Sequence, residues 1–356
     1  MMTHRPDCMV EFDRRSVLKA CGTIGATGIA SSLSGCLGSE DEFPSRTMTW
    51  VTVFSEGGGM DTTFRQIQPH LEEAFGQDIT PRYESGAGTR EGVIVALEEG
   101  ADDLHWLLGT RSPSTPATIA LDEDEDDRDP QYELDDIAPL GRLDVEPSLL
   151  RVRPDDDRFQ TIEELVDYAD DNPGEVSIGA SAPTGRNMLA HLFLQEAVDV
   201  EFEHIVFEGG GPTETALFQE EIDVAGRSMF NSLDIHEETT CLCVFEEENV
   251  WEEITNDAPT ANDALGLDVN WDPTVASGIY AVASSAADEN PDDYEYLVEQ
   301  FREAHQSEEY HEDLEEIHPL EPTKLDYLPP DETMEVMENT LDEYREFVPL
   351  FQEYVF

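Results

Sequence analysis

The sequence predicts an α/β protein built from two units, each a mainly parallel sheet flanked by helices. The order of strand, small-residue loop and helix recurs along the chain, and strands that alternate with helices form parallel sheets. With 356 residues, of which 39% are hydrophobic, the chain is long enough to bury two cores.

The first repeat starts at residues 50–54, which are rich in β-branched and aromatic side chains. A glycine-rich turn, residues 55–61, leads into a helix expected over residues 62–75, where apolar residues recur with helical spacing. Adjacent glycines let backbone N–H groups converge at the positive end of the helix, so this corner suits an anion. The turn lacks the spacing of a dinucleotide-binding or P-loop motif. A tight turn capped by Asp61 is the alternative.

More repeats follow in the first unit. We expect a strand at 79–83, a second glycine loop at 84–89, a helix at 90–99 and a buried strand at 104–109. Ligands of open sheets bind at the carboxyl ends of such strands.

A second unit begins after a strand at 148–152. Its expected segments are a helix at 161–170, a strand at 176–179, a loop at 180–187, a helix containing Leu189, a strand at 202–207, a glycine loop at 208–212 and a helix at 213–219. A strand within 271–283 returns the chain to the first unit, and helices at 291–305 and 331–351 complete it.

The charge of the chain indicates adaptation to high salt. It has 82 acidic and 19 basic residues, a formal charge of −63. At 1 M salt the Debye length is about 3 Å, which screens this self-repulsion. Periodic apolar segments exclude an acidic disordered chain, and the lack of a basic patch argues against a nucleic acid partner. The acidic run at 122–129 is expected to be a solvated surface insertion, with a loose cation site as the alternative.

The N-terminus resembles a twin-arginine export signal that ends in a lipobox. Arg14 and Arg15 precede a small, mildly apolar stretch at 20–33, too short to span a bilayer, and Cys36 follows. The resemblance implies that residues 1–35 are a signal peptide and that Cys36 carries a lipid. Residues 36–47 would then be the linker to the lipid anchor. An ordinary helix with a chance cysteine is the alternative.

No catalytic motif is present, so we expect neither an enzyme nor a cofactor or bound metal. His305, His311 and His318 are expected to be solvated surface histidines, since the last two would lie about 10.5 Å apart on a helix, too far to share a metal. Cys241 and Cys243 are compatible with a strained disulfide or half a metal site, but buried free thiols in a strand fit better.

An ordered set of short motifs resembles one protein family: residues 54–61, 84–88, 107–110, 172–174, 181–187, 206–212 and 222–224. The set is similar to the substrate-binding proteins of tripartite tricarboxylate transporters, the TctC or Bug family. The resemblance implies a two-lobed periplasmic-binding-protein-like (type II) fold with a cleft between the lobes. Lobe 1 would comprise 48–148 and 271–356, and lobe 2 would comprise 149–270.

The resemblance also implies which residues line the cleft. Lobe 1 would contribute Gly57, Gly58, Gly59, Asp61, Ser85, Gly86, Ala87, Gly88 and Thr110. Lobe 2 would contribute Ser181, Thr184, Gly185, Arg186, Asn187, Gly209 and Gly210. Backbone amides and ordered water would make the main contacts to the ligand, because bonds from amides to an anion are charge-assisted and need no lysine.

The chain departs from the family pattern at several places. Ser55 and Glu56 replace the usual proline and small residue, Asn187 replaces a histidine and Glu208 a lysine. The two glutamates leave room for a cation that bridges to the ligand. Arg186 is an addition: it could pair with a distal carboxylate, or it could be a surface arginine that balances local acid.

The sequence therefore predicts a lipid-anchored receptor on the outer face of the cytoplasmic membrane. It would capture an organic anion of the tri- or dicarboxylate class and deliver it to the permease subunits of a tripartite tricarboxylate transporter. The alternative is a solute sensor of the same fold that signals to a membrane partner. The identity of the carboxylate and the oligomeric state stay open.

Overall fold

The computed structural model describes residues 43–86, 89–124, 131–207, 209–271 and 276–355. Residues 42–356 form one compact unit. The predicted export signal, with Arg14, Arg15 and Cys36, lies outside the described residues.

The first sheet has six strands in the order β11-β4-β10-β3-β1-β2. Their bounds are β1 Met48–Thr52, β2 Ile79–Tyr83, β3 Trp106–Ser112, β4 Ile137–Glu146, β10 Ala276–Ala283 and β11 Leu325–Leu328. β1 is parallel to β2 and β3, whereas β10 is antiparallel to β3 and β4, and β11 to β4. The strand-helix repeats thus build the parallel half. We call this sheet and its helices lobe 1.

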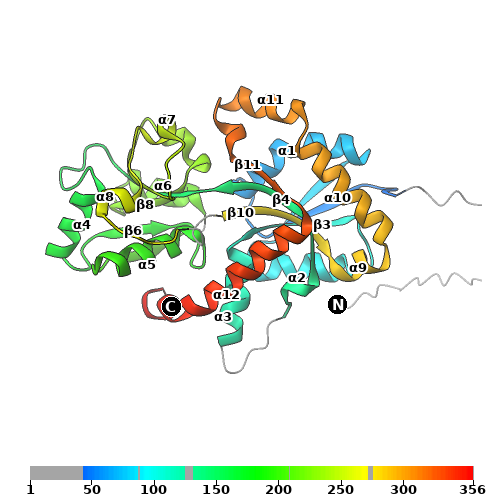
Figure 1. The fold of residues 1–356 in the computed structure, drawn as a ribbon, viewed down its shortest axis with the longest axis horizontal. Coiled ribbons are helices and arrows are strands. Elements are labelled where there is room, and N and C mark those ends of the chain that lie inside the picture. The colour runs from blue at the N-terminus through cyan, green and yellow to red at the C-terminus, as the bar shows by residue number, and fades with distance from the viewer. Residues whose placement is uncertain (1–42, 87–88, 125–130, 208, 272–275, 356) are drawn as a thin grey trace, which may run out of the picture. The chain divides into compact units, whose positions relative to one another are not determined.

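The second sheet has five strands in the order β7-β6-β8-β5-β9. Their bounds are β5 Ser148–Val152, β6 Ser177–Ala180, β7 Glu203–Val206, β8 Val224–Ser228 and β9 Thr240–Phe245. β6 is parallel to β7 and β8, and β5 is antiparallel to β8 and β9. Only Pro147 separates β4 from β5, so the chain passes directly from one sheet to the other (Figure 1). We call the second sheet and its helices lobe 2. The predicted two-lobed α/β fold is confirmed.

Twelve α-helices surround the sheets in the described part of the chain. They are α1 Gly59–Phe75, α2 Arg90–Glu99, α3 Ser114–Asp124, α4 Ile162–Asp171, α5 Arg186–Val198, α6 Gly210–Phe218, α7 Glu252–Thr255, α8 Ala261–Leu265, α9 Ser284–Glu289, α10 Pro291–His305, α11 Glu308–Ile317 and α12 Pro330–Tyr354. Three short 3₁₀ helices are η2 Leu134–Asp136, η3 Phe230–Ile235 and η5 Glu321–Lys324. The predicted helices are present within a few residues of their expected ends.

The apolar stripe of α1 is buried against the first sheet, as its spacing predicts. Phe64 and Ile67 are fully buried, and the Phe64 ring stacks on Trp50 of β1 with ring centroids 3.7 Å apart. Burying each such side chain contributes about 1.5–3 kcal/mol. The stripe therefore fixes the start of α1, and the glycine loop before it, to the end of β1.

The last helix packs against both lobes. Met337 and Tyr344 of α12 are buried in a core shared with Leu189 of α5, and the ring of Phe347 lies 4.6 Å from that of Phe193. The assignment of residues 331–351 to lobe 1 stays a prediction. In the structure the C-terminal end of α12 also contacts lobe 2.

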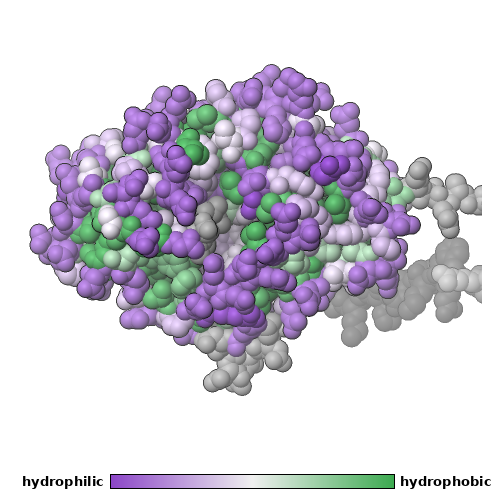
Figure 2. All heavy atoms as spheres, in the orientation of Figure 1, coloured by the Kyte–Doolittle hydropathy of each residue, from purple (hydrophilic) through white to green (hydrophobic). Residues whose placement is uncertain are grey.

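Hydrophilic side chains cover most of the face seen in Figure 2, and hydrophobic residues form small separate patches. Within the described residues no helix has the length and apolar character needed to cross a membrane.

Three side-chain predictions outside the cleft are now settled. Cys241 and Cys243 are buried free thiols in β9, as expected. His305 is not a surface histidine: it is buried in α10, with Nε2 2.7 Å from the carbonyl oxygen of Leu143. Asp122, expected in a solvated insertion, is buried in α3, where its pairing with Arg90 offsets the cost of burying the charge. Residues 125–130 of that run lie outside the described residues.

Candidate ligand-binding site

Two of the N–H groups of the first glycine loop are hydrogen-bonded to other residues of the same loop. The Gly57 N–H donates to Asp61 Oδ2 (2.9 Å), and the Gly58 N–H donates to the Ser55 carbonyl oxygen (3.1 Å). Gly57 has φ +77°, a conformation that favours glycine. The Asp61-capped turn is therefore present in this half of the loop. Among the described residues, the N–H of Gly59 at the start of α1 has no partner.

Asp61 is a positioning residue for that loop. Its side chain is 3% exposed, and its other oxygen, Oδ1, accepts a hydrogen bond from the Tyr83 hydroxyl (2.7 Å). Arg65 Nε also donates to Oδ2 (3.1 Å). Burial alone would raise the pKa of Asp61, but the hydrogen bonds from Gly57, Tyr83 and Arg65 outweigh it and hold the pKa below its usual value.

The structure describes Thr110 and part of the second glycine loop. The Thr110 side chain is fully buried, and its hydroxyl lies 2.5 Å from that of Thr115. Ser85 is exposed, and Gly86 lies against the carboxylate of Glu91. Ala87 and Gly88 lie outside the described residues.

The two predicted loops of lobe 2 are joined to each other. Gly185 precedes α5, and Gly209, with φ +108°, precedes α6. The Gly209 N–H donates to the Ser181 carbonyl oxygen (3.0 Å), which ties the α6 loop to the α5 loop. Thr184, in the same loop as Ser181, is buried.

Asn187 fixes the start of α5 to the second sheet. Its Nδ2 donates to the Gly226 carbonyl oxygen of β8 (3.1 Å), and its Oδ1 accepts from the Ser148 hydroxyl of β5 (2.8 Å). Both functional atoms of the amide are used, so Asn187 holds the helix terminus in place.

Residues from the starts of three helices contact residues 227–231, the end of β8 and the start of η3, which we call the 227–231 segment. Gly59 of α1 packs so closely that a Cβ there would lie 2.6 Å from Asn231 Nδ2. Gly210 of α6 lies in the same way against Arg227, and Arg186 of α5 donates to Ser228. Each N-terminus carries partial positive charge and unpaired N–H groups, so their convergence suits an anion.

Two arginines beside this segment are buried. Arg186 is 7% and Arg227 4% exposed. Arg227 Nη2 donates to the Asn231 carbonyl oxygen (2.7 Å) and to Glu214 (3.3 Å). Burial lowers the pKa of Arg186 to about 10, although Glu146 opposes this shift. The interpretation of Arg186 as a surface arginine is therefore wrong.

Two more charged residues near these arginines, Glu146 and Arg111, belong to lobe 1. Glu146, at the end of β4, is fully buried: its Oε1 accepts from Asn231 Nδ2 (2.7 Å), and its Oε2 lies 3.8 Å from Arg186 Nη2. Burial raises the pKa of Glu146 despite the nearby Arg186 and Arg111. Arg111, at the end of β3, lies 3.5 Å from Asp144. The contact from Glu146 to Asn231 joins the two lobes.

Sequence reasoning missed Arg111, Glu146, Arg227 and Asn231. Arg111 and Arg227 did carry a signal, because an arginine in an apolar strand is unusual in a chain with so few basic residues. Glu146 carried none, since one glutamate is indistinguishable among so many acids. Glu56, considered for a bridging cation, is exposed and lies 3.6 Å from Arg65, and Glu208 is outside the described residues.

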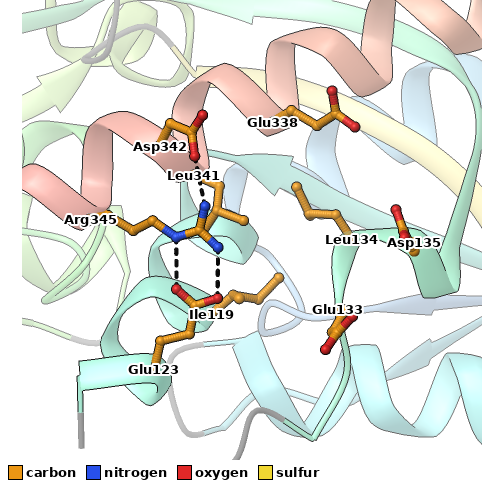
Figure 3. A pocket seen from close by; sticks show the side chains of 9 residues that line it. All are labelled: Ile119, Glu123, Glu133, Leu134, Asp135, Glu338, Leu341, Asp342 and Arg345. Carbon is orange, nitrogen blue, oxygen red and sulfur yellow. Dashed lines mark hydrogen bonds and ion pairs between the residues drawn. The ribbon is translucent and has the colours of Figure 1, made fainter.

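A separate pocket of about 400 Å³ lies between α3, η2 and α12 (Figure 3). Its lining is rich in carboxylates, and its one arginine, Arg345, is already bonded to Glu123 (2.7 Å) and Asp342 (2.6 Å). None of the predicted cleft residues lines it. Its negative charge makes it a poor site for an anion. Nor do the described residues contain a group of three potential metal ligands.

Comparisons with known proteins point the same way as the geometry. Residues 64–240 match the family described as "Tripartite tricarboxylate transporter family receptor". A Pseudomonas protein from the tcbD-tcbE intergenic region is 32% identical over 185 residues, 52% of this chain and 53% of its own length. Protein BugT of Bordetella pertussis is 25% identical over 189 residues, 53% of this chain and 55% of its own length. The matched region thus spans little more than half of each relative.

Solved structures share the fold. A structure described as a periplasmic transporter has a TM-score of 0.72 with 17% identity, covering 86% of this chain and 97% of its own. MatC of Rhodopseudomonas palustris with bound malate has a TM-score of 0.70 with 19% identity, covering 86% and 100%. Another R. palustris protein, with adipate, has a TM-score of 0.68 with 19% identity, covering 88% and 98%.

The family is one of receptors, in agreement with the prediction of a binding protein rather than an enzyme. The matched region contains the starts of α5 and α6 and the 227–231 segment, and most of the motifs noted in the sequence. This chain belongs to the tripartite tricarboxylate transporter receptor family, also called TctC or Bug.

Proposed function

We propose that this protein is an extracytoplasmic receptor that binds an organic carboxylate between its lobes. The observation that carries the proposal is the meeting of three helix N-termini and two buried arginines at the 227–231 segment. In a chain with a formal charge of −63, such a collection of positive groups has few uses other than holding an anion.

Ligand binding is coupled to closure of the lobes. Gly59 belongs to lobe 1, whereas Arg186, Arg227 and Asn231 belong to lobe 2. A ligand that contacts both groups binds the closed arrangement better than an open one and shifts the population toward it.

The solute is of the di- or tricarboxylate class, and the receptor hands it to the permease subunits of a tripartite tricarboxylate transporter. Two proteins with this fold are described with malate and with adipate, which supports the class. We further propose export through Arg14 and Arg15 and lipid attachment at Cys36, which would keep the receptor at the outer face of the cytoplasmic membrane.

A thermal-shift screen tests the proposal. The protein is heated in multimolar KCl with organic carboxylates, and with amino acids, sugars and inorganic phosphate as controls. We expect a saturable rise in melting temperature from carboxylates, without consumption of the compound. Stabilisation by sugars or phosphate alone, or turnover of the compound, would refute the assignment.

A further inference from the structure

We propose that Arg186 and Arg227, with Arg111 behind them, grip one carboxylate of the ligand directly, and that Glu146 competes with the ligand for Arg186. The proposal rests on the function proposed above. In addition to the backbone amides of the helix N-termini, arginine side chains would bind the ligand. Glu146 would compete with the ligand for one of them, Arg186.

All three arginines have hydrogen-bond donors that no described acceptor uses. Arg186 Nε, Arg227 Nε and Arg111 Nη1 are buried and make no hydrogen bond within the described residues. All three side chains are at least nine-tenths buried. Unpaired buried donors are costly, and a charged guanidinium is more costly than a neutral group. Unused donors on three neighbouring arginines indicate a missing acceptor.

The fully buried charges around these arginines do not balance. Around these three arginines the fully buried carboxylates are Asp144 and Glu146, which leaves one positive charge in excess. Glu214, which also pairs with Arg227, has a side chain that is 24% exposed, so solvent screens its charge more than those of the fully buried groups. One ligand carboxylate would supply the missing negative charge.

Arg186 and Glu146 form an ion pair without a hydrogen bond between them. Their closest contact, 3.8 Å, is an ion pair but too long for a hydrogen bond, and Glu146 Oε2 has no hydrogen-bond donor among the described residues. Glu146 is held by Asn231 instead. Arg186 is thus attracted by Glu146 without being satisfied by it, and a ligand carboxylate can offer the two-pronged contact that Glu146 does not make.

This arrangement distinguishes a ligand grip from a simple latch between the lobes. If Arg186 and Glu146 only hold the closed state together, removing either charge weakens ligand binding. If Glu146 competes with the ligand, its removal has the opposite effect from removal of Arg186. The sign of the effect of Glu146→Gln therefore separates the two roles.

The experiment is calorimetric titration of the full chain in multimolar KCl with malate, adipate and citrate. Hexanoate, which matches adipate but has one carboxylate, is the ligand control. We expect Arg186→Gln to weaken binding of the best dicarboxylate or tricarboxylate probe at least about tenfold and Glu146→Gln to tighten it. Arg302→Gln is the matched control and should bind like the wild type, because Arg302 lies on α10, has a side chain that is 43% exposed and pairs with Glu299.

Folding of each variant is checked by thermal unfolding without ligand. If Arg186→Gln alone does not fold, the double variant Arg186→Gln/Glu146→Gln removes both partners and leaves neither charge unpaired; it should still bind at least about tenfold more weakly than the wild type. Unchanged affinity in a folded Arg186→Gln or double variant, or weaker binding by Glu146→Gln, would overturn the grip while the receptor function stands. Absence of binding by every carboxylate would overturn both proposals.

Discussion

The carboxylate of Asp61 is bonded on both oxygens by groups of its own lobe. It joins the glycine loop to Tyr83 and Arg65, so its negative charge is already compensated by hydrogen bonds within the protein. Gly59, which meets Asn231, and Glu146, which accepts from the same side chain, contact the opposite lobe. Asp61 therefore positions the loop, whereas Gly59 and Glu146 make contacts with the other lobe.

Replacing Asp61 by asparagine should remove a pH-dependent contribution to stability. The folded pKa is lower than the ordinary 3.8, so the ionised carboxylate stabilises the fold above that value, and this contribution is lost as the pH falls through the folded pKa. We expect Asp61→Asn to cost about 1–3 kcal/mol at neutral pH. Denaturant unfolding at constant salt should show the gap from wild type closing in acid; a gap that is constant with pH would contradict this role.

A side chain at Gly59 should interfere with closure of the lobes. The Cβ of Gly59→Ala would lie 2.6 Å from Asn231 Nδ2, so Asn231 must move and lose its bond to Glu146. We expect weaker carboxylate binding in calorimetry with little change in the fold of lobe 1. An affinity of Gly59→Ala equal to that of the wild type would argue against the contact.

At the scale of elements, the sequence predicts those whose apolar pattern is regular. α1, α2, α10 and α12 have apolar stripes, and the turn glycines mark where the strand-helix units begin. β4 was missed because Pro139 and Gly141 interrupt it, and both residues normally argue against a strand interior. It is nevertheless held by β10 on one side and β11 on the other.

The same contrast explains how much of the candidate site could be predicted. The glycine loops and Arg186 were found because local sequence marks helix starts. Glu146 and Asn231 were missed because they meet only when two lobes, distant in sequence, come together. Local pattern contains no information about such a contact.

The packing of α12 across both lobes should make them unfold together. Phe347 touches Phe193 of lobe 2, and α12 buries Met337 and Tyr344 in a core shared with Leu189 of α5. We expect a single unfolding transition for the wild type. Phe347→Ala should lose about 1–3 kcal/mol and broaden or split the transition in calorimetry. Two separate transitions in the wild type would contradict the coupling.

For the molecule as a whole, we expect the formal charge of −63 to make stability depend on salt. The Debye length grows from about 3 Å at 1 M to about 10 Å at 0.1 M salt, so carboxylates on neighbouring elements begin to repel one another. We expect the melting temperature to fall steadily as KCl is withdrawn, and sucrose at equal osmolality not to restore it. A melting temperature independent of KCl over this range would contradict the salt adaptation.

The most direct test of the central claim is a crystal structure of the protein grown in multimolar KCl with the carboxylate that stabilises it most. We predict ligand density between the lobes, with one carboxylate within hydrogen-bonding distance of Arg186 and of an N–H at the start of α1, α5 or α6. Density in the carboxylate-lined pocket between α3 and α12, or at any place that contacts only one lobe, would contradict it.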